Sequence, residues 1–117
     1  VFKGKVVVHR DAQGADAQQS SDNLLLSEHG EIDAKPELEI YTDDVKCSHG
    51  TTVGELNLEQ LFYLCSRGVN EATAKGLLTF AFANTILQRI EVPEVRKRAA
   101  SSIAGELPDY QNWGGLL

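Results

Sequence analysis

Two short apolar runs stand out in the first quarter of the chain, each set among polar residues. They are Val6–Val8 and Leu24–Leu26, and polar, turn-forming segments flank both. Continuous apolar runs of this length are typical of strands that are buried on both faces or packed in a closed core. The pattern therefore predicts two strands that build a core in the first half of the chain.

A different pattern follows at residues 37–42, where apolar positions alternate with charged or polar ones. This period of two is typical of a half-exposed strand. Pro36 is expected just before this strand, where its missing N–H does little harm. Asp43-Asp44 predicts a turn, and a further strand is expected over Val45–His49.

The three histidines lie 20 residues apart, at His9, His29 and His49. A fixed spacing of this size is typical of stacked solenoid coils that place their strands in parallel sheets. Residues 1–56 contain no Asn-Gly or Asp-Gly hairpin turn, which a parallel coil does not need. Two interpretations stay open, a solenoid and a coincidence among three residues.

The pattern becomes helical after Asn57, which is placed as an N-cap with Gln60 three residues later. One face of the predicted helix is apolar, at Leu58, Leu61, Phe62 and Cys65. We expect Cys65 to fill core volume, as buried thiols usually do. Gly68 is expected to end this helix.

Two further helices are predicted beyond Gly68. Asn70 is expected to cap the second helix, whose apolar positions run most of the way round it, so it is central or covered by a partner. Its main stripe is expected at Leu78, Phe82, Ile86 and Ile90, with Leu77, Ala81 and Thr85 beside it. Pro93 predicts the start of a third helix, and residues 108–117 are expected to form an irregular tail anchored by Trp113.

Composition supports a division into a β-rich part, residues 1–56, and a helical part with an irregular tail, residues 57–117. The net charge of the 117-residue chain is −6, and all of it falls in residues 1–56. Such acidity argues against nucleic acid as a partner, and no apolar stretch is long enough to span a membrane. The chain contains no methionine, so we expect it to be a segment of something longer. No signal peptide is evident and both cysteines are expected to be reduced, which predicts a cytoplasmic protein.

Cys47-Ser48-His49 is the local arrangement with the most chemical promise. In a strand, residues two apart point to the same face, so Cys47 and His49 are expected to project together. Thiolate and imidazole are ligands that suit iron–sulfur and zinc chemistry. A closed tetrahedral centre needs about four donors, and no Cys-x-x-Cys or His-x-x-x-His motif supplies the rest. The sequence therefore predicts a transient site, or one that a partner completes, while a chance Cys-x-His pair stays the alternative.

Several separate blocks of the chain carry one common resemblance. They are residues 4–13, 23–27, 35–40, 43–50, 61–64 and 66–68. Together they resemble the SufB/SufD family of iron–sulfur cluster assembly proteins, over residues 1 to about 113. The Cys-Ser-His-Gly form at residues 47–50 is similar to the SufD branch.

The resemblance implies a mixed β and α fold, in which the last coils of a right-handed parallel β-helix precede a small C-terminal helical domain. It also implies a non-enzymatic scaffold subunit that docks a SufC-like ABC ATPase through residues 57–117. A SufB-like paralogue is expected near the end of the β-helix, where Cys47 and His49 would contact iron or a nascent cluster. No cofactor is expected to stay bound to the isolated chain.

Three further expectations complete this interpretation. A β-helix cut open at Val1 would expose an unpaired layer, through which the chain can form a homodimer. One alternative function is a structural β-solenoid interaction module without a metal role. The other is a metal-dependent or thiol enzyme that uses Cys47 and His49 within one chain.

Overall fold

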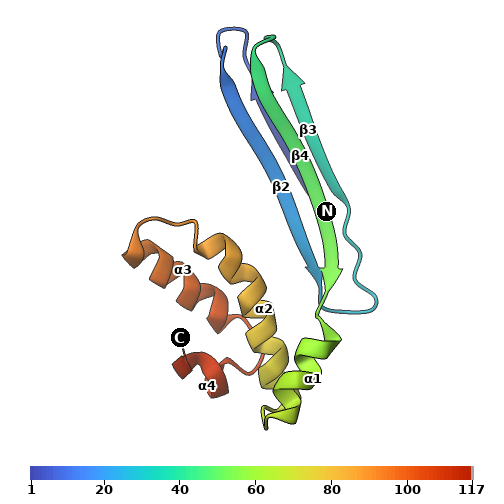
Figure 1. Ribbon diagram of the computed structural model, residues 1–117, viewed down its shortest axis with the longest axis vertical. Coiled ribbons are helices and arrows are strands. Elements are labelled where there is room, and N and C mark those ends of the chain that lie inside the picture. The colour runs from blue at the N-terminus through green and yellow to red at the C-terminus, as the bar shows by residue number, and fades with distance from the viewer. Residues whose placement is uncertain (117) are drawn as a thin grey trace. The chain divides into compact units, whose positions relative to one another are not determined.

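The computed structural model describes residues 1–116 and has a mixed β and α fold (Figure 1). The chain divides into two compact units, Val1–Glu55 and Leu56–Leu117. The first unit contains four strands, and the second contains four α-helices and a short 3₁₀ turn.

The strands of the first unit form two parallel pairs. β1 (Phe2–Val8) pairs with β3 (Ala34–Ile40), and β2 (Ala15–Leu25) pairs with β4 (Val45–Glu55). Paired strands are therefore two apart along the chain, and no strand pairs with its immediate neighbour in sequence. This arrangement explains why no tight hairpin turn is present, because parallel neighbours need a longer connection.

The spacing of paired residues differs from the 20-residue period suggested by the histidines. Phe2 lies beside Ala34, 32 positions later, and Ala15 lies beside Val45, 30 positions later. The offset shortens because the connection before β4 has two residues fewer than the connection before β2. Of the two interpretations of the histidine spacing, a coil period of 20 residues is therefore wrong, and the spacing is a coincidence.

Side chains alternate between two faces in each strand. Gln19 packs against Gly4, so the two sheets face each other, with Val8 buried and Val7 more than one-third exposed. Of the two alternatives for the valine and leucine runs, burial on both faces is wrong, since Val7 is exposed and Leu26 lies beyond β2, whereas Val8 is buried in a core. Most of β2 was not predicted at all, because residues 15–23 are polar or small.

Pro36 lies inside β3 rather than before it, which corrects the prediction from sequence. The backbone N–H of Phe2 donates to the Asp33 carbonyl, and the N–H of Tyr41 donates to the Val8 carbonyl. Odd-numbered residues of this segment therefore bond to β1, while the nitrogen of Pro36 faces the open edge of the sheet. A proline fits at such a position because no ladder hydrogen bond is lost.

The outer face of the β1–β3 pair carries ion pairs between the strands. Lys3 Nζ lies 3.4 Å from a Glu37 carboxylate oxygen, and Lys5 is paired with Glu39. The hydrogen bond between Lys5 and Glu39 raises the pKa of the lysine and lowers the pKa of the glutamate. The glutamates of β3 thus form ion pairs with the lysines of β1, so this face of the pair can stay exposed to solvent.

The first three helices of the second unit begin where Asn57, Asn70 and Pro93 predict. They are α1 (Leu58–Ser66), α2 (Glu71–Leu87), α3 (Pro93–Gly105) and α4 (Tyr110–Trp113), followed by the 3₁₀ turn Gly114–Leu116. The Asn57 side chain accepts hydrogen bonds from the first turn of α1, and Asn70 accepts one from Thr73 N in α2. Gly68, with φ of 92°, follows α1 in the left-handed conformation that glycine favours.

The core of the second unit lies between α2, α3 and α4. Its buried members are Phe80, Leu87, Ala104 and Trp113. The predicted main stripe of α2 is therefore wrong, since Phe82 and Ile86 are exposed and the buried face carries Phe80 instead. The prediction of a central helix is confirmed, because α2 packs against α1, α3 and α4.

The last residues are more ordered than an irregular tail. Trp113 is fully buried, as the sequence predicted, but it belongs to the short helix α4. Its indole N–H donates to the Pro108 carbonyl at 3.0 Å, and its ring lies edge-on to Tyr110. Among residues 1–116, no helix is long and apolar enough to cross a membrane.

Candidate functional site

The candidate site lies on β4, which begins just after the turn at Asp43-Asp44. Cys47 and His49 occupy alternate positions of this strand and therefore share one face. Cys47 is half-buried and His49 is exposed. The structure thus brings these two residues together, as the sequence predicted.

The neighbouring strand β2 contributes the residues paired with Cys47 and His49. Cys47 lies beside Ala17, and His49 lies beside Gln19, in the parallel register of β2 and β4. Paired residues of adjacent strands project to the same face, about 4.8 Å apart along the hydrogen-bonding direction. Ala17 and Gln19 are therefore the β2 residues adjacent to Cys47 and His49 on this face.

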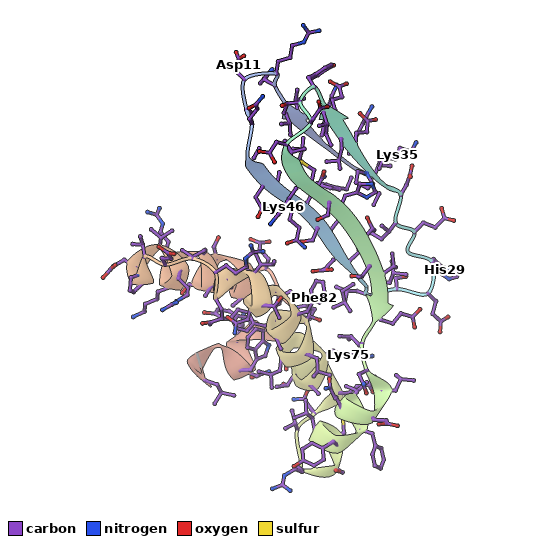
Figure 2. The ribbon with its side chains drawn as sticks, turned by 45° about the horizontal axis from the view of Figure 1, so that its top comes forward. Asp11, His29, Lys35, Lys46, Lys75 and Phe82 are labelled. Atoms are coloured by element: carbon purple, nitrogen blue, oxygen red, sulfur yellow. The ribbon has the colours of Figure 1, made fainter. Side chains whose placement is uncertain are left out.

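Two donors do not make a closed metal site. Within residues 1–116, no group of three or more histidine, cysteine or acidic side chains could hold a metal ion. His9 follows β1 in a turn, and His29 lies in the connection between β2 and β3 (Figure 2). Both remaining histidines are exposed and lie outside the strands, so they do not join the site.

The second thiol also lies elsewhere in the chain. Cys65 is half-buried in α1, and both cysteines are free. Cys65 was expected to fill a core position but is only half-buried, and no side chain within Leu58–Ser66 is fully buried. The cysteines therefore provide one candidate ligand beside His49 and one thiol on a half-exposed helix.

Gln19 is the residue of this site that sequence reasoning missed. Its side-chain oxygen is buried without a hydrogen-bond partner among the residues that the structure describes. The sequence gives little sign of this role, because Gln18 and Gln19 are adjacent and identical in type. Only their positions within a strand determine that Gln18 faces outward and Gln19 faces inward. Without a predicted strand over 15–23, neither could be placed.

A second candidate surface belongs to the helical unit. Leu58, Phe62 and Tyr63 of α1 are exposed to 77%, 74% and 58%. Tyr63 also lines a mostly apolar groove of about 450 Å³ between α1 and α2, together with Leu64, Leu78 and Ala81, whereas Leu58 and Phe62 are not part of its lining. An apolar groove and exposed aromatic and aliphatic side chains on one helix are typical of an interaction surface.

Residues 1–82 match the family model described as "SUF system FeS cluster assembly, SufBD core domain". The chain belongs to the SufBD family. This match covers both parallel strand pairs, the Cys47/His49 site, α1 and most of α2. It assigns the chain to the SUF system of iron–sulfur cluster assembly, and the expected resemblance is confirmed.

Individual relatives within the SufBD family support the same assignment. The chain is 42% identical over 108 residues to the iron–sulfur cluster assembly protein SufD of Escherichia coli. It is 45% identical over 104 residues to a SufBD family protein of Synechocystis, and 35% identical over 103 residues to SufD of Bacillus subtilis. The alignments cover 92%, 89% and 88% of this chain.

The same alignments cover only 26%, 23% and 24% of the three relatives. The chain therefore spans about a quarter of the length of the SufBD proteins it matches. Membership of the family follows from these matches, whereas the activity and partners of the whole proteins do not.

Proposed function

We propose that this chain acts as part of a non-enzymatic scaffold subunit of the SUF iron–sulfur cluster assembly complex. The observation that carries this proposal is the Cys47/His49 pair, which projects from the last strand of a parallel pair inside the region that matches the SufBD core. The pair offers two donors suited to iron–sulfur chemistry and has no third within residues 1–116. A scaffold that shares its site with a partner fits such an incomplete set.

We further propose that the four strands are the last coils of a right-handed parallel β-helix, residues 1–56, followed by a helical domain, residues 57–117. Pairing of β1 with β3 and of β2 with β4, at offsets of 32 and 30, is the register that successive coils produce. The open edges of β3 and β4 then form the end of the stack. A SufB-like paralogue would meet this end and supply the missing donors to iron or a nascent cluster.

The helical domain would bind a SufC-like ABC ATPase. The mostly apolar groove between α1 and α2 supports this role, and so do the exposed Leu58 and Phe62 elsewhere on α1, because large apolar side chains on a solvent-facing helix favour a protein partner. Movement of the bound ATPase would reach the subunit first at α1. We place the complex in the cytoplasm, which agrees with two free cysteines.

The test is iron–sulfur loading of the assembled complex with His49→Ala in the intact protein, compared with His29→Ala. His29 is an exposed histidine outside the site, so its variant should load normally. We expect His49→Ala to lose most of the iron and acid-labile sulfide, while the ATPase and paralogue still co-purify. Normal loading of the His49→Ala complex would exclude a metal role and favour a purely structural module.

The isolated protein separates the scaffold from the enzyme alternative. A single-chain metal enzyme would hold stoichiometric metal without partners, as measured by inductively coupled plasma mass spectrometry after anaerobic purification. We expect no metal above the level of the His49→Ala variant. Stoichiometric metal that depends on Cys47 and His49 in the isolated protein would contradict the shared site.

A further inference from the structure

Gln19 is a polar side chain in the interior of the strand unit. It lies on the inner face of β2, and its Oε1 atom is buried with no hydrogen-bond partner among residues 1–116. Gln18, one position earlier, points outward and is exposed. Buried polar atoms are nearly always hydrogen-bonded, so this oxygen points to an interaction that the side chain is built to make.

Gly4 of the facing sheet makes room for the Gln19 carboxamide. A Cβ atom at Gly4 would collide with the carboxamide nitrogen of Gln19. The side chain therefore lies where any residue other than glycine would displace it. This close approach holds the carboxamide inside the unit, rather than letting it turn out to water.

The parallel register places Gln19 directly beside His49. The two are paired residues of β2 and β4, so their side chains share the inner face and start about 4.8 Å apart. The other neighbours on this face of β2 are Ala17, which offers only a methyl group, and Ser21, whose hydroxyl accepts a hydrogen bond from Asn23 and keeps its own O–H free to donate. On the paired strand, the imidazole N–H of His49 is the candidate donor for the buried oxygen.

Such a hydrogen bond would decide which nitrogen of His49 is free. A neutral imidazole has one N–H and one lone pair, and the partner of the N–H fixes the tautomer. Histidines that bind metal commonly donate their other ring N–H to an oxygen acceptor, which orients the ring. A carboxamide oxygen can serve as this acceptor.

We propose that Gln19 is a positioning residue for His49. Its oxygen accepts the imidazole N–H and directs the second ring nitrogen toward the cargo, with Gly4 keeping the carboxamide in place. This inference rests on the proposed function only in naming iron or a nascent cluster as that cargo. The hydrogen bond itself can be measured in the absence of iron.

The test is the tautomer of His49 in the intact protein labelled with ¹⁵N-histidine, read from long-range ¹H–¹⁵N correlation spectra at alkaline pH. The His49 signals are assigned by their loss in His49→Ala. We expect one dominant tautomer in the wild type and in Gln18→Leu, and a mixture of both tautomers in Gln19→Leu. Gln19→Glu retains an acceptor oxygen and should restore the single tautomer.

Gly4→Ala provides an independent variant, because it displaces the carboxamide without altering Gln19. It should produce the same mixture of tautomers, and a thermal melt confirms that each variant is folded. An unchanged tautomer in both folded variants, Gln19→Leu and Gly4→Ala, would overturn the inference.

Iron loading of the complex then distinguishes the two proposals. We expect Gln19→Leu to retain several-fold less iron than Gln18→Leu, between the wild type and His49→Ala. If the tautomer changes while His49→Ala loads iron normally, Gln19 positions His49 but the proposed function fails. If His49→Ala loses iron while the tautomer is independent of Gln19, the positioning role fails alone.

Discussion

Gly76 shows how one residue determines the packing of the helical unit. A Cβ atom at this buried position of α2 would lie 2.7 Å from both the Pro108 carbonyl oxygen and the indole nitrogen of Trp113. These two atoms form the hydrogen bond that anchors α4. The absence of a side chain at Gly76 therefore lets the only tryptophan of the chain be fully buried.

Gly76→Ala should destabilise the protein although alanine is the better helix former. We expect a loss of about 1–3 kcal/mol in the free energy of unfolding, because the added methyl group overpacks the core around Trp113. Gly105→Ala is the matched control, since Gly105 is also a helical glycine, the last residue of α3, but has open space around it. Chemical denaturation measures both, and equal stabilities of the two variants would contradict the tight contact.

Sequence reasoning found the residues whose effect is local and missed those whose effect depends on a distant neighbour. Asn57, Asn70 and Gly68 act within one turn of helix, so their roles follow from spacing alone. The interior position of Gln19 depends on Gly4 in the facing sheet and on pairing with His49, 30 positions later in the chain. No local pattern carries that information.

At the scale of the element, α1 depends on its ends more than the other helices do. Within Leu58–Ser66 no side chain is fully buried, so packing contributes less here than in α2, which has five buried residues. Its first turn donates to Asn57 Oδ1 from Glu59 N at 2.9 Å and from Gln60 N at 3.0 Å. The N-cap is therefore a large part of what holds this helix in place.

Asn57→Ala should loosen α1 without unfolding the rest of the unit. Loss of the cap typically costs about 1 kcal/mol, and we expect the amides of α1 to exchange with solvent about five-fold faster in native-state hydrogen exchange. Asn57→Ser is the control, because a serine hydroxyl can accept the same bonds. Equal exchange in Asn57→Ala and Asn57→Ser would show that packing, rather than the cap, stabilises α1.

The elements that sequence reasoning predicted poorly share one physical cause. The helix α2 is apolar nearly all round, so only the positions of α3 and α4 decide that Phe80 is buried and Phe82 is exposed. Similarly, β2 has few apolar residues, and pairing with β4 rather than composition makes it a strand. Tertiary context determined the outcome in both cases.

At the scale of the whole molecule, the two units present different surfaces to partners. The strand unit presents the incomplete Cys47/His49 pair, and the helical unit presents the apolar groove between α1 and α2. The geometry of the Cys47/His49 pair could be predicted, because two positions on one strand share a face whatever the fold. The groove could not, since its walls come from two helices whose packing the sequence pattern did not specify.

Tyr63→Glu should weaken binding of the proposed ABC ATPase partner about ten-fold or more, because it places a charge in the lining of the apolar groove. The matched control is Val95→Glu on α3, an apolar residue that is 54% exposed and lies outside the groove. Affinities of the intact protein for the purified ATPase are measured by isothermal titration calorimetry. An equal loss in both variants, or none in Tyr63→Glu, would exclude the groove as the docking surface.

The proline in β3 has a consequence for how the strand unit can be extended. A foreign strand laid beside β3 would find one of its carbonyl groups opposite Pro36, with no N–H to satisfy it. The neighbouring strand β4 contains no proline in its eleven residues and imposes no such penalty. A partner strand can therefore pair with β4 in full hydrogen-bonded register, whereas beside β3 one of its carbonyl groups goes without a hydrogen bond. The two open edges of the strand unit are thus not equivalent for pairing with a partner strand.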